Sequence, residues 1–327
     1  MTTLKKVYTV INEVIELNPV PLAASGGEGA VFLIVNSNEY PNHCVKIYKD
    51  EILKKPEKID LKRKKVQYLI SHRPPNYLHE DHFMFCWPIQ TIHDLSGNFI
   101  GFIMPLAFTE SEKLYELSTL NMHRRFDQHW KKWDRSSTIG FKARLGICNR
   151  VAFAVYCLHK WEKFIIADLK PQNILINREG KISITDIDSF QIYSAKEIKY
   201  QGDAATPEYL PAEYHLPGEA NQIPTINWDK FAMAVSFYQI LFGIHPYSAT
   251  AKDILKISMI HENITNDLFV HGVNKVHLKI VPLPHEKYHS LPKSMQALFI
   301  RAFDKTIPTN RPTAEEWAIV LRDELTK

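Results

Sequence analysis

The chain has 327 residues, of which 45% are hydrophobic and 11% aromatic, so it can bury a large core and has room for about two domains. Its formal net charge is +4, which is only mildly basic. That balance does not require nucleic acid or an anionic membrane as a partner, and a phosphate-binding cleft would account for it.

The cysteines and the apolar segments indicate an intracellular protein. The four cysteines show no CxxC spacing and are expected to be buried or free thiols in a reducing compartment. The N-terminal stretch carries acidic residues where a signal peptide would have its apolar core. The longest apolar run, residues 231–242, is too short to cross a bilayer. We therefore expect a cytoplasmic location.

A glycine cluster is the first distinctive segment of the chain. Residues 7–17 alternate weakly and predict a first strand or an arm that precedes one, and residues 22–35 then read LAASGGEGAVFLIV. Glycines let the backbone approach a ligand closely, and the N–H groups of such a loop can cradle phosphate oxygens. Taken alone, a loop of this kind is a weak indication of phosphate binding.

A strand with one lysine in an apolar frame follows, and then a charged helix. Lys46 lies in HCVKIY, residues 43–48. It is either an ordinary edge-strand lysine or, because the glycine cluster directly precedes it, a ligand for phosphate. Residues 51–71 predict a helix with Pro56 in its first turn. Its basic run is expected to be a solvated face, with a docking patch as the alternative.

Strand patterns follow the helix. Residues 83–91 and 98–105 are expected to form two strands joined by a turn-rich loop. His79 and His82, just before them, have the spacing of a metal pair but no third ligand in view.

Two helices are predicted next. Residues 111–135 predict a polar helix that packs through Trp130 and Trp133, or that helps to bind a substrate or partner. Residues 141–158 predict a strongly apolar helix.

The most informative stretch is residues 164–190, FIIADLKPQNILINREGKISITDIDSF. Its apolar runs predict short buried strands, and the N-R-E-G segment at residues 177–180 predicts a hairpin turn between two of them. Polar side chains flank these strands: Asp168, Lys170 and Asn173 before the hairpin and Asp186 after it. Loops on a rigid scaffold are where ligand-binding residues concentrate.

This set of side chains suits phosphoryl transfer. Mg2+ takes one or two carboxylates together with substrate phosphates, and Asn173 and Asp186 fit that task. Asp168 can then orient a hydroxyl and accept its proton, while Lys170 neutralises the phosphate that moves. Each residue alone could be an ordinary polar loop residue; the pattern D-L-K-P-x-N with a hairpin and a second Asp makes that reading poor. The segment resembles the catalytic and metal-binding loops of eukaryotic-type Ser/Thr protein kinases. Its D-I-D-S-F-Q string resembles a bacterial subset of these kinases, whose genes lie in stress and tellurite-resistance clusters.

The resemblance assigns roles along the chain. It implies catalytic Asp168 and Lys170, metal ligands Asn173 and Asp186, and ATP and Mg2+ as cofactors. Lys46 would grip the α- and β-phosphates, and Met104 would be the gatekeeper before the adenine-reading linker. The residues that it implies for nucleotide binding are Ala24, Gly26, Gly27, Glu28, Gly29, Val31, Cys44, Lys46, Met104, Leu106 and Leu175.

The chain departs from the family pattern at several positions. Ala24 replaces the first glycine of the phosphate loop. The helix has no acid where a glutamate should pair with Lys46; Glu57 and Asp60 are the candidates to substitute, and the sequence leaves open which of them, if any, does so. Ile166 replaces the His before the catalytic Asp, which removes a scaffold hydrogen bond. Ala167 replaces the Arg that usually receives an activating phosphate, so we expect activation that does not depend on loop phosphorylation. Asp188 replaces a glycine, which makes a flip of the metal loop harder.

Further matches lie downstream. Thr206 begins TPEY and Glu213 ends PAE, which resemble the floor of the peptide site. Glu213 is expected to pair with Arg311 in PTNRPTAEEW, and Asp229 to anchor the catalytic loop from the start of a helix. Together the matches run from about residue 20 to 320.

The resemblance therefore predicts an α+β, bilobal protein-kinase-like fold. Residues 1–104 would form a small β-rich nucleotide-binding lobe and residues 105–327 a larger α-helical catalytic lobe. The expected partners are a protein substrate with a Ser or Thr acceptor and a cognate phosphatase or regulator, with no nucleic acid and no membrane. Two alternatives stay open at this point: a pseudokinase that acts as a nucleotide-binding scaffold, and a small-molecule kinase of related fold.

Overall fold

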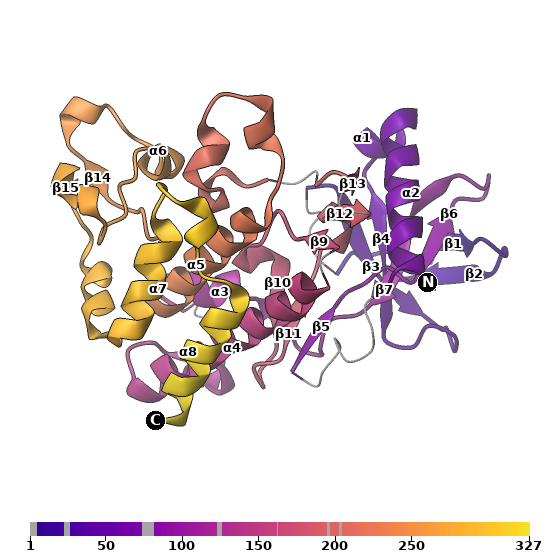
Figure 1. The fold of residues 1–327 in the computed structure, drawn as a ribbon. Helices are drawn as coiled ribbons and strands as arrows, with labels where there is room; N and C mark the ends of the chain where they lie inside the picture. The colour runs from indigo at the N-terminus through magenta and orange to yellow at the C-terminus, as the bar shows by residue number, and fades with distance from the viewer. Residues whose placement is uncertain are drawn as a thin grey trace. The chain divides into compact units, whose positions relative to one another are not determined.

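The computed structural model in Figure 1 describes residues 5–22, 27–73, 82–122, 126–161, 163–194, 197–202 and 205–327. Its contacts divide the chain into two compact units. The first unit contains Met1–Pro75, Phe85–Thr109 and Thr185–Asp188; the second contains Asn76–Met84, Glu110–Ile184 and Ser189–Lys327. The short segment Thr185–Asp188 therefore joins the first unit from far down the chain.

A closed antiparallel barrel forms the first unit. The strand order is β1-β2-β3-β4-β7-β6, and pairing between β1 and β6 closes it. A closed barrel leaves no unpaired edge for other chains to extend. The strands are β1 (Lys5–Thr9), β2 (Val14–Leu17), β3 (Gly29–Val35), β4 (His43–Tyr48), β6 (Gln90–His93) and β7 (Phe99–Pro105).

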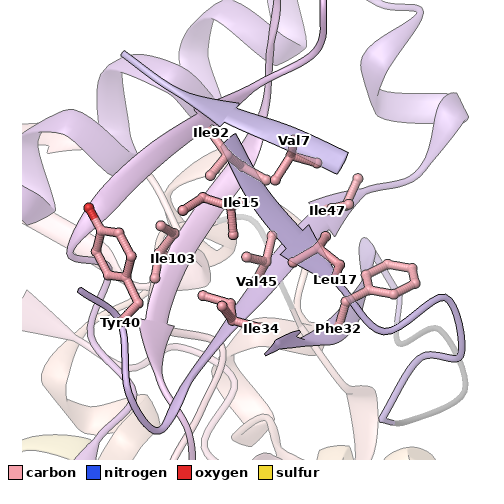
Figure 2. Packing of buried hydrophobic residues seen from close by; sticks show 10 residues of the cluster. All are labelled: Val7, Ile15, Leu17, Phe32, Ile34, Tyr40, Val45, Ile47, Ile92 and Ile103. Atoms are coloured by element: carbon pink, nitrogen blue, oxygen red, sulfur yellow. The ribbon is translucent and has the colours of Figure 1, made fainter. Parts of the chain in front are cut away.

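The barrel interior is a hydrophobic cluster of mostly aliphatic residues with Phe32 and Tyr40, which Figure 2 shows. Val45 and Ile47 of β4 point into it, and Ile103 of β7 does the same. Successive side chains of a strand point to opposite faces. The residues that alternate with these three therefore stand on the other face of the barrel wall, and Lys46 is one of them.

Two helices accompany the barrel: α1 (Asp50–Leu53) and α2 (Pro56–Ser71). Pro56 begins α2, as predicted, because its missing N–H costs nothing in the first turn. Val66 and Leu69 of α2 are fully buried, and the indole of Trp87 donates to the Leu69 carbonyl at 2.8 Å. The helix is thus fixed to the barrel.

The second unit is mostly helical, which confirms the predicted α+β, kinase-like fold class. At its centre is α5, where 14 of 17 residues are buried. None of the described helices combines the length and apolar content that a membrane span needs. The helices are α3 (Tyr115–Ser118), α4 (Thr138–Lys160), α5 (Ile226–Phe242), α6 (Ile260–Thr265), α7 (Lys293–Phe303) and α8 (Ala314–Thr326).

Short sheets carry the loops of the second unit. The orders are β5-β11-β10-β8, β13-β12-β9 and β14-β15. The predicted hairpin joins β10 to β11, and the side chain of Asn177 caps it by accepting from the N–H groups of Glu179 and Lys181. The strands are β5 (Phe83–Phe85), β8 (Glu112–Lys113), β9 (Phe164–Ile165), β10 (Ile174–Ile176), β11 (Ile182–Ile184), β12 (Gln191–Ser194), β13 (Glu197–Tyr200), β14 (Thr250–Ala251) and β15 (Leu278–Ile280).

Three predicted elements are corrected. Residues 7–17 form parts of two strands, β1 and β2, rather than one. Residues 83–91 do not form one strand, because Pro88 cannot donate to a ladder and the strand pattern breaks around it. Residues 111–135 are not one helix: they hold β8, α3 and the 3-10 helix η2 (Gln128–Trp133). The two tryptophans of η2 are nonetheless buried, as expected.

A buried arginine joins three elements of the second unit. Arg144 of α4 is fully buried, and its guanidinium donates to the backbone carbonyls of Leu117, Trp133 and Ile240. Backbone carbonyls left over at helix ends need such donors.

The close contact of β7 with β4 yields a first prediction. A Cβ at Gly101 would lie 1.9 Å from the carbonyl oxygen of Lys46, so neither strand can accommodate it without shifting. We expect Gly101→Ala to lower the unfolding free energy by about 1–3 kcal/mol or more, as overpacking does. Denaturant unfolding followed by circular dichroism measures the loss.

Gly146→Ala in α4 is the matched control for Gly101→Ala. A Cβ there would meet only Arg150 Nη1 at 3.6 Å, an ordinary contact. Alanine is the better helix former by about 1 kcal/mol, so this variant should be at least as stable as the wild type. Equal stability of Gly101→Ala and wild type would show that the strand contact is not tight.

Candidate functional site

Four of the predicted nucleotide-binding residues share one face of the barrel wall. Lys46 lies opposite Val31 on β3, and Cys44 lies opposite Met104 on β7. Their neighbours in the strands point into the barrel core, so these four side chains point away from it. The Cys44 thiol donates weakly to the Met104 carbonyl at 3.7 Å, and burial raises the pKa of this thiol to about 12. The Cys44 thiol therefore stays protonated and unreactive, and the residue serves to pack this face.

The ammonium of Lys46 is buried and lies between two carboxylates. It donates to both oxygens of Asp188, at 2.7 and 2.9 Å, and to Asp186 Oδ1 at 3.1 Å. The Tyr48 hydroxyl donates to Asp188 Oδ2 at 3.0 Å. The Asp188 side chain is completely buried, whereas that of Asp186 is 46% exposed. Asp188 is thus the internal counter-ion, and Asp186 stays open to a ligand or solvent on one side.

Electrostatics favours the ionised pair. Burial alone would lower the pKa of Lys46, but the charges of Asp188 and Asp186 outweigh it and raise that pKa above its ordinary value. Burial alone would raise the pKa of Asp188, but the charges of Lys46 and Lys62 and the hydrogen bond from Tyr48 lower it to about 2. Both groups are charged at neutral pH.

Helix α2 contributes a lysine where an acid was expected. Lys62, only 2% exposed, donates to Glu28 Oε2 at 2.6 Å. Neither substitute that the sequence offered reaches Lys46: Glu57 is exposed, and Asp60 pairs with basic side chains of its own helix. The hypothesis that one of these two acids pairs with Lys46 is therefore wrong, because the carboxylates of the 185–188 segment occupy that place.

The glycine-rich segment is described only in part. Ala24 and Gly26 lie outside the described residues, as does His79 of the proposed histidine pair. Gly27 and Gly29 are described, and a Cβ at Gly29 would lie 2.6 Å from the Ile47 carbonyl oxygen. The absent side chain at that position is what lets the segment leave the barrel so close to β4.

The predicted adenine-reading linker has one group already engaged. The Leu106 N–H donates to the Asn42 carbonyl at 2.9 Å, inside the first unit. The Leu106 carbonyl, rather than its N–H, is therefore the backbone group of this residue that suits a hydrogen bond to an adenine base.

In the second unit, polar groups converge on Asp168. Lys170 Nζ lies 2.6 Å from Asp168 Oδ2, and the Thr206 hydroxyl donates to Asp168 Oδ1 at 2.7 Å. Lys170 also donates to Thr206 Oγ1 at 2.6 Å. The amide nitrogen of Asn173 donates to the carboxylate and to the backbone carbonyl of Asp168, at 3.0 and 2.9 Å. These contacts hold the carboxylate in one orientation.

A buried carboxylate of α5 holds the loop that carries Asp168. Asp229 accepts from the N–H groups of Ile166 and Ala167, at 2.8 and 3.0 Å. His159 of α4 lies 2.8 Å from the same carboxylate through Nε2. Ala167 adopts a φ of 64°, a left-handed conformation that is costly for a residue other than glycine, and the two bonds to Asp229 compensate for it.

Other predicted pairs fall within the second unit. Arg311 donates to both oxygens of Glu213, as the sequence predicted, and the Nη2 distance is 2.8 Å. Leu175 lies half-buried in β10, beside the loop of Asp168. Asp186 belongs to the first unit and Asn173 to the second, so their pairing as metal ligands stays a prediction.

Sequence reasoning missed three contributors. Tyr48 and Asp188 were not recognised as part of the Lys46 site, although the unusual D-I-D string marked the position of Asp188. His159 was not recognised either. It lies seven residues before Ile166, and its hydrogen bond to Asp229 supplies a contact that the missing His of the catalytic loop seemed to remove. A histidine at the end of a long helix gives no signal of such a contact in a single sequence.

Comparison with known proteins identifies a common domain. The family model described as "Protein kinase domain" matches residues 93–319. "Protein kinase YegI" of Escherichia coli K12 is 26% identical over 339 residues, which cover 98% of this chain and 46% of the relative. "Probable serine/threonine-protein kinase CPE1738" of Clostridium perfringens is 25% identical over 178 residues, which cover 54% of this chain and 23% of the relative. The chain thus spans about half the length of YegI, and less of the clostridial protein.

A solved structure has the same fold. It is described as "ROP18 kinase domain in complex with AMP-PNP and sucrose", with a TM-score of 0.66 and 15% sequence identity. The superposition covers 99% of this chain and 84% of the other.

The depressed pKa of Asp188 predicts a pH dependence of stability. Its folded pKa of about 2 lies below the ordinary aspartate value of 3.8, so the group adds stability above pH 3.8 and loses it as the pH falls toward 2. The contribution is about 2 kcal/mol at neutral pH. The difference in unfolding free energy between wild type and Asp188→Asn should therefore shrink on acidification. Urea titrations from pH 7 down to pH 3 measure it, with Asp323→Asn of α8, whose side chain is 61% exposed, as the control. A difference independent of pH would contradict the ion pair.

Proposed function

Because the chain belongs to the protein kinase family, we propose that it transfers the γ-phosphate of ATP to serine or threonine hydroxyls of protein substrates. The observation that carries this proposal is the arrangement around Asp168. Asp168 is 6% exposed, and its carboxylate receives hydrogen bonds from Asn173 and Thr206, with the Lys170 ammonium 2.6 Å away.

The proposed reaction is an in-line displacement at the γ-phosphorus. The substrate hydroxyl donates a hydrogen bond to the Asp168 carboxylate, which orients it and accepts its proton as the new oxygen–phosphorus bond forms. The bond to the β,γ-bridging oxygen breaks, and ADP leaves with that electron pair. Lys170 offsets the negative charge on the transferred phosphoryl group. Thr206 holds the side chains of Asp168 and Lys170 in place through its hydrogen bonds to both.

The donor set fits a nucleotide with Mg2+. Asn173 has an amide oxygen, a ligand type that suits a hard cation, and Asp186 offers a partly exposed carboxylate. When bound, the ion neutralises phosphate charge. Lys46 would contact the α- and β-phosphates, with Gly27, Glu28 and Gly29 along the phosphates.

The adenine would rest on the outward face that carries Val31, Cys44 and Met104, next to the linker of Leu106. Leu175 would complete the contacts to the base. The AMP-PNP in the description of the ROP18 structure supports an ATP-type ligand, since this ligand is an ATP analogue.

Two observations support serine and threonine as the acceptor residues: the names of relatives and the identity of one residue in the catalytic loop. Several relatives, including CPE1738, are named as serine/threonine kinases. Lys170 in the catalytic loop favours serine and threonine by resemblance. We also propose the small lobe as residues 1–104 and the large lobe as 105–327. A cytoplasmic location, a cognate phosphatase or regulator, and the lack of nucleic-acid and membrane partners stay predictions from the sequence.

A transfer assay tests the proposed function. Purified protein with labelled ATP, Mg2+ and a generic protein substrate should incorporate label into serine or threonine. Asp168→Ala and Lys46→Ala should each reduce incorporation by a factor of about 1,000 or more, because each removes a group that acts in the transition state. Wild type that binds ATP but transfers no more phosphate than the two variants would favour the scaffold alternative.

Thr206 offers a second prediction. Thr206→Val keeps the shape but removes the hydroxyl that connects Lys170 with Asp168, and we expect kcat to fall about 10- to 100-fold with little change in the KM for ATP. Thr206→Ser keeps the hydroxyl and should retain most activity. Steady-state kinetics at varied ATP and peptide concentrations separate the two parameters. A serine variant as slow as the valine variant would indicate that the methyl group, not the hydroxyl, matters.

A further inference from the structure

The buried lysine of this site lacks the partner that its family leads one to expect. In protein kinases the strand lysine pairs with a glutamate of the next helix. Here that helix, α2, turns a lysine inward: Lys62 is 2% exposed. The two acids of α2, Glu57 and Asp60, do not contact Lys46 in the structure, since one is exposed and the other pairs within its own helix. The negative charge must come from elsewhere.

Asp188 supplies that charge with better geometry than Asp186. Both of its oxygens lie within 2.9 Å of Lys46 Nζ, while Asp186 offers one oxygen at 3.1 Å. The Asp188 side chain is 0% exposed, and Tyr48 fixes its second oxygen at 3.0 Å. A two-oxygen contact inside the protein sets both the position and the direction of the ammonium.

Lys62 makes an internal acid at this place necessary. The ammonium groups of Lys46 and Lys62 lie 5.9 and 5.8 Å from the centre of the same Tyr48 ring. Both are buried positive charges beside the same ring, and each is costly unless an acid compensates it. Glu28 pairs with Lys62 at 2.6 Å, and Asp188 pairs with Lys46.

We propose that Asp188 is the positioning residue of Lys46, in the role that the helix glutamate has in other kinases. The inference rests on the proposed function, because it takes Lys46 as the ligand of the nucleotide phosphates. It assigns Asp188 no contact with the substrate. Asp188 acts through Lys46, and Tyr48 supports it. The helix α2 then has no part in aligning Lys46 and instead anchors Glu28 of the glycine-rich segment.

A double-mutant cycle on ATP binding and turnover tests the proposal. The full chain is compared with Asp188→Asn, Lys46→Met and the double variant, with ATP affinity from titration calorimetry and kcat/KM from labelled transfer. Asp188→Asn should lower kcat/KM for ATP about 100-fold, as misplacement of a catalytic contact does. In the Lys46→Met background, Asp188→Asn should change ATP affinity by less than about twofold, because the lysine that Asp188 positions is absent.

Further variants separate positioning from folding. Tyr48→Phe removes one hydrogen bond to Asp188 and keeps the ring, so it should fold and show a smaller loss in the same direction. Asp60→Asn and Glu57→Gln on α2 should match the wild type. Melting temperatures of all variants identify any that are unfolded, and the Tyr48→Phe result then decides the proposal.

The outcomes distinguish this inference from the proposed function. Losses in ATP affinity that add up independently for Lys46 and Asp188, or wild-type affinity in folded Asp188→Asn, would overturn the positioning role. A loss caused by Asp60→Asn or Glu57→Gln would return that role to α2. If wild type transfers no phosphate, the proposed function fails, but the cycle in ATP affinity still decides the role of Asp188. A wild type that binds no ATP overturns both.

Discussion

An ion buried in a protein must find an opposite charge or hydrogen-bond partners within the fold, and this requirement shapes both units. A buried ion without a partner costs several kcal/mol, which is a large part of the stability of a domain. The barrel wall must therefore bring an acid to Lys46, and it does so by taking up the segment Thr185–Asp188. In the second unit, Asp229 meets the same need through two backbone N–H groups and His159, and Arg144 does so through three carbonyls.

The contacts that compensate these buried charges also restrain the backbone and the side chain of Asp168. Asp229 holds the backbone on the N-terminal side of Asp168, where Ala167 adopts an unfavourable φ of 64°. Lys170, Asn173 and Thr206 hold its side chain. A carboxylate restrained from both sides is preorganised for its task, and preorganised groups need little rearrangement during reaction. Stability and the proposed catalysis thus depend on the same contacts here.

The sequence was sufficient where the signal was local. Alternating apolar residues and the turn at residues 177–180 correctly predicted that Asp168 and Asn173 lie on loops beside a hairpin. The apolar residues within 141–158 correctly predicted α4. It failed where the partner was distant or the pattern was mixed. Lys46 and Asp188 are 142 positions apart, and no local pattern connects them. Pro88 broke an apolar run that looked like one strand, and the short 3-10 helix η2 imitated the spacing of an α-helix.

The distance between Lys46 and Asp188 along the chain has a consequence for synthesis. A ribosome adds about 5–20 residues per second, so the 142 positions between them take about 7–28 s. Once β7 ends at Pro105, all strands of the barrel have been made while the acid for Lys46 has not. The nascent barrel must either keep this lysine hydrated or hold it uncharged. Burial of Lys46 on the outward face of the barrel is therefore a late event, which follows synthesis of residues 185–188, and the N-terminal residues do not complete their structure in the order in which they are made.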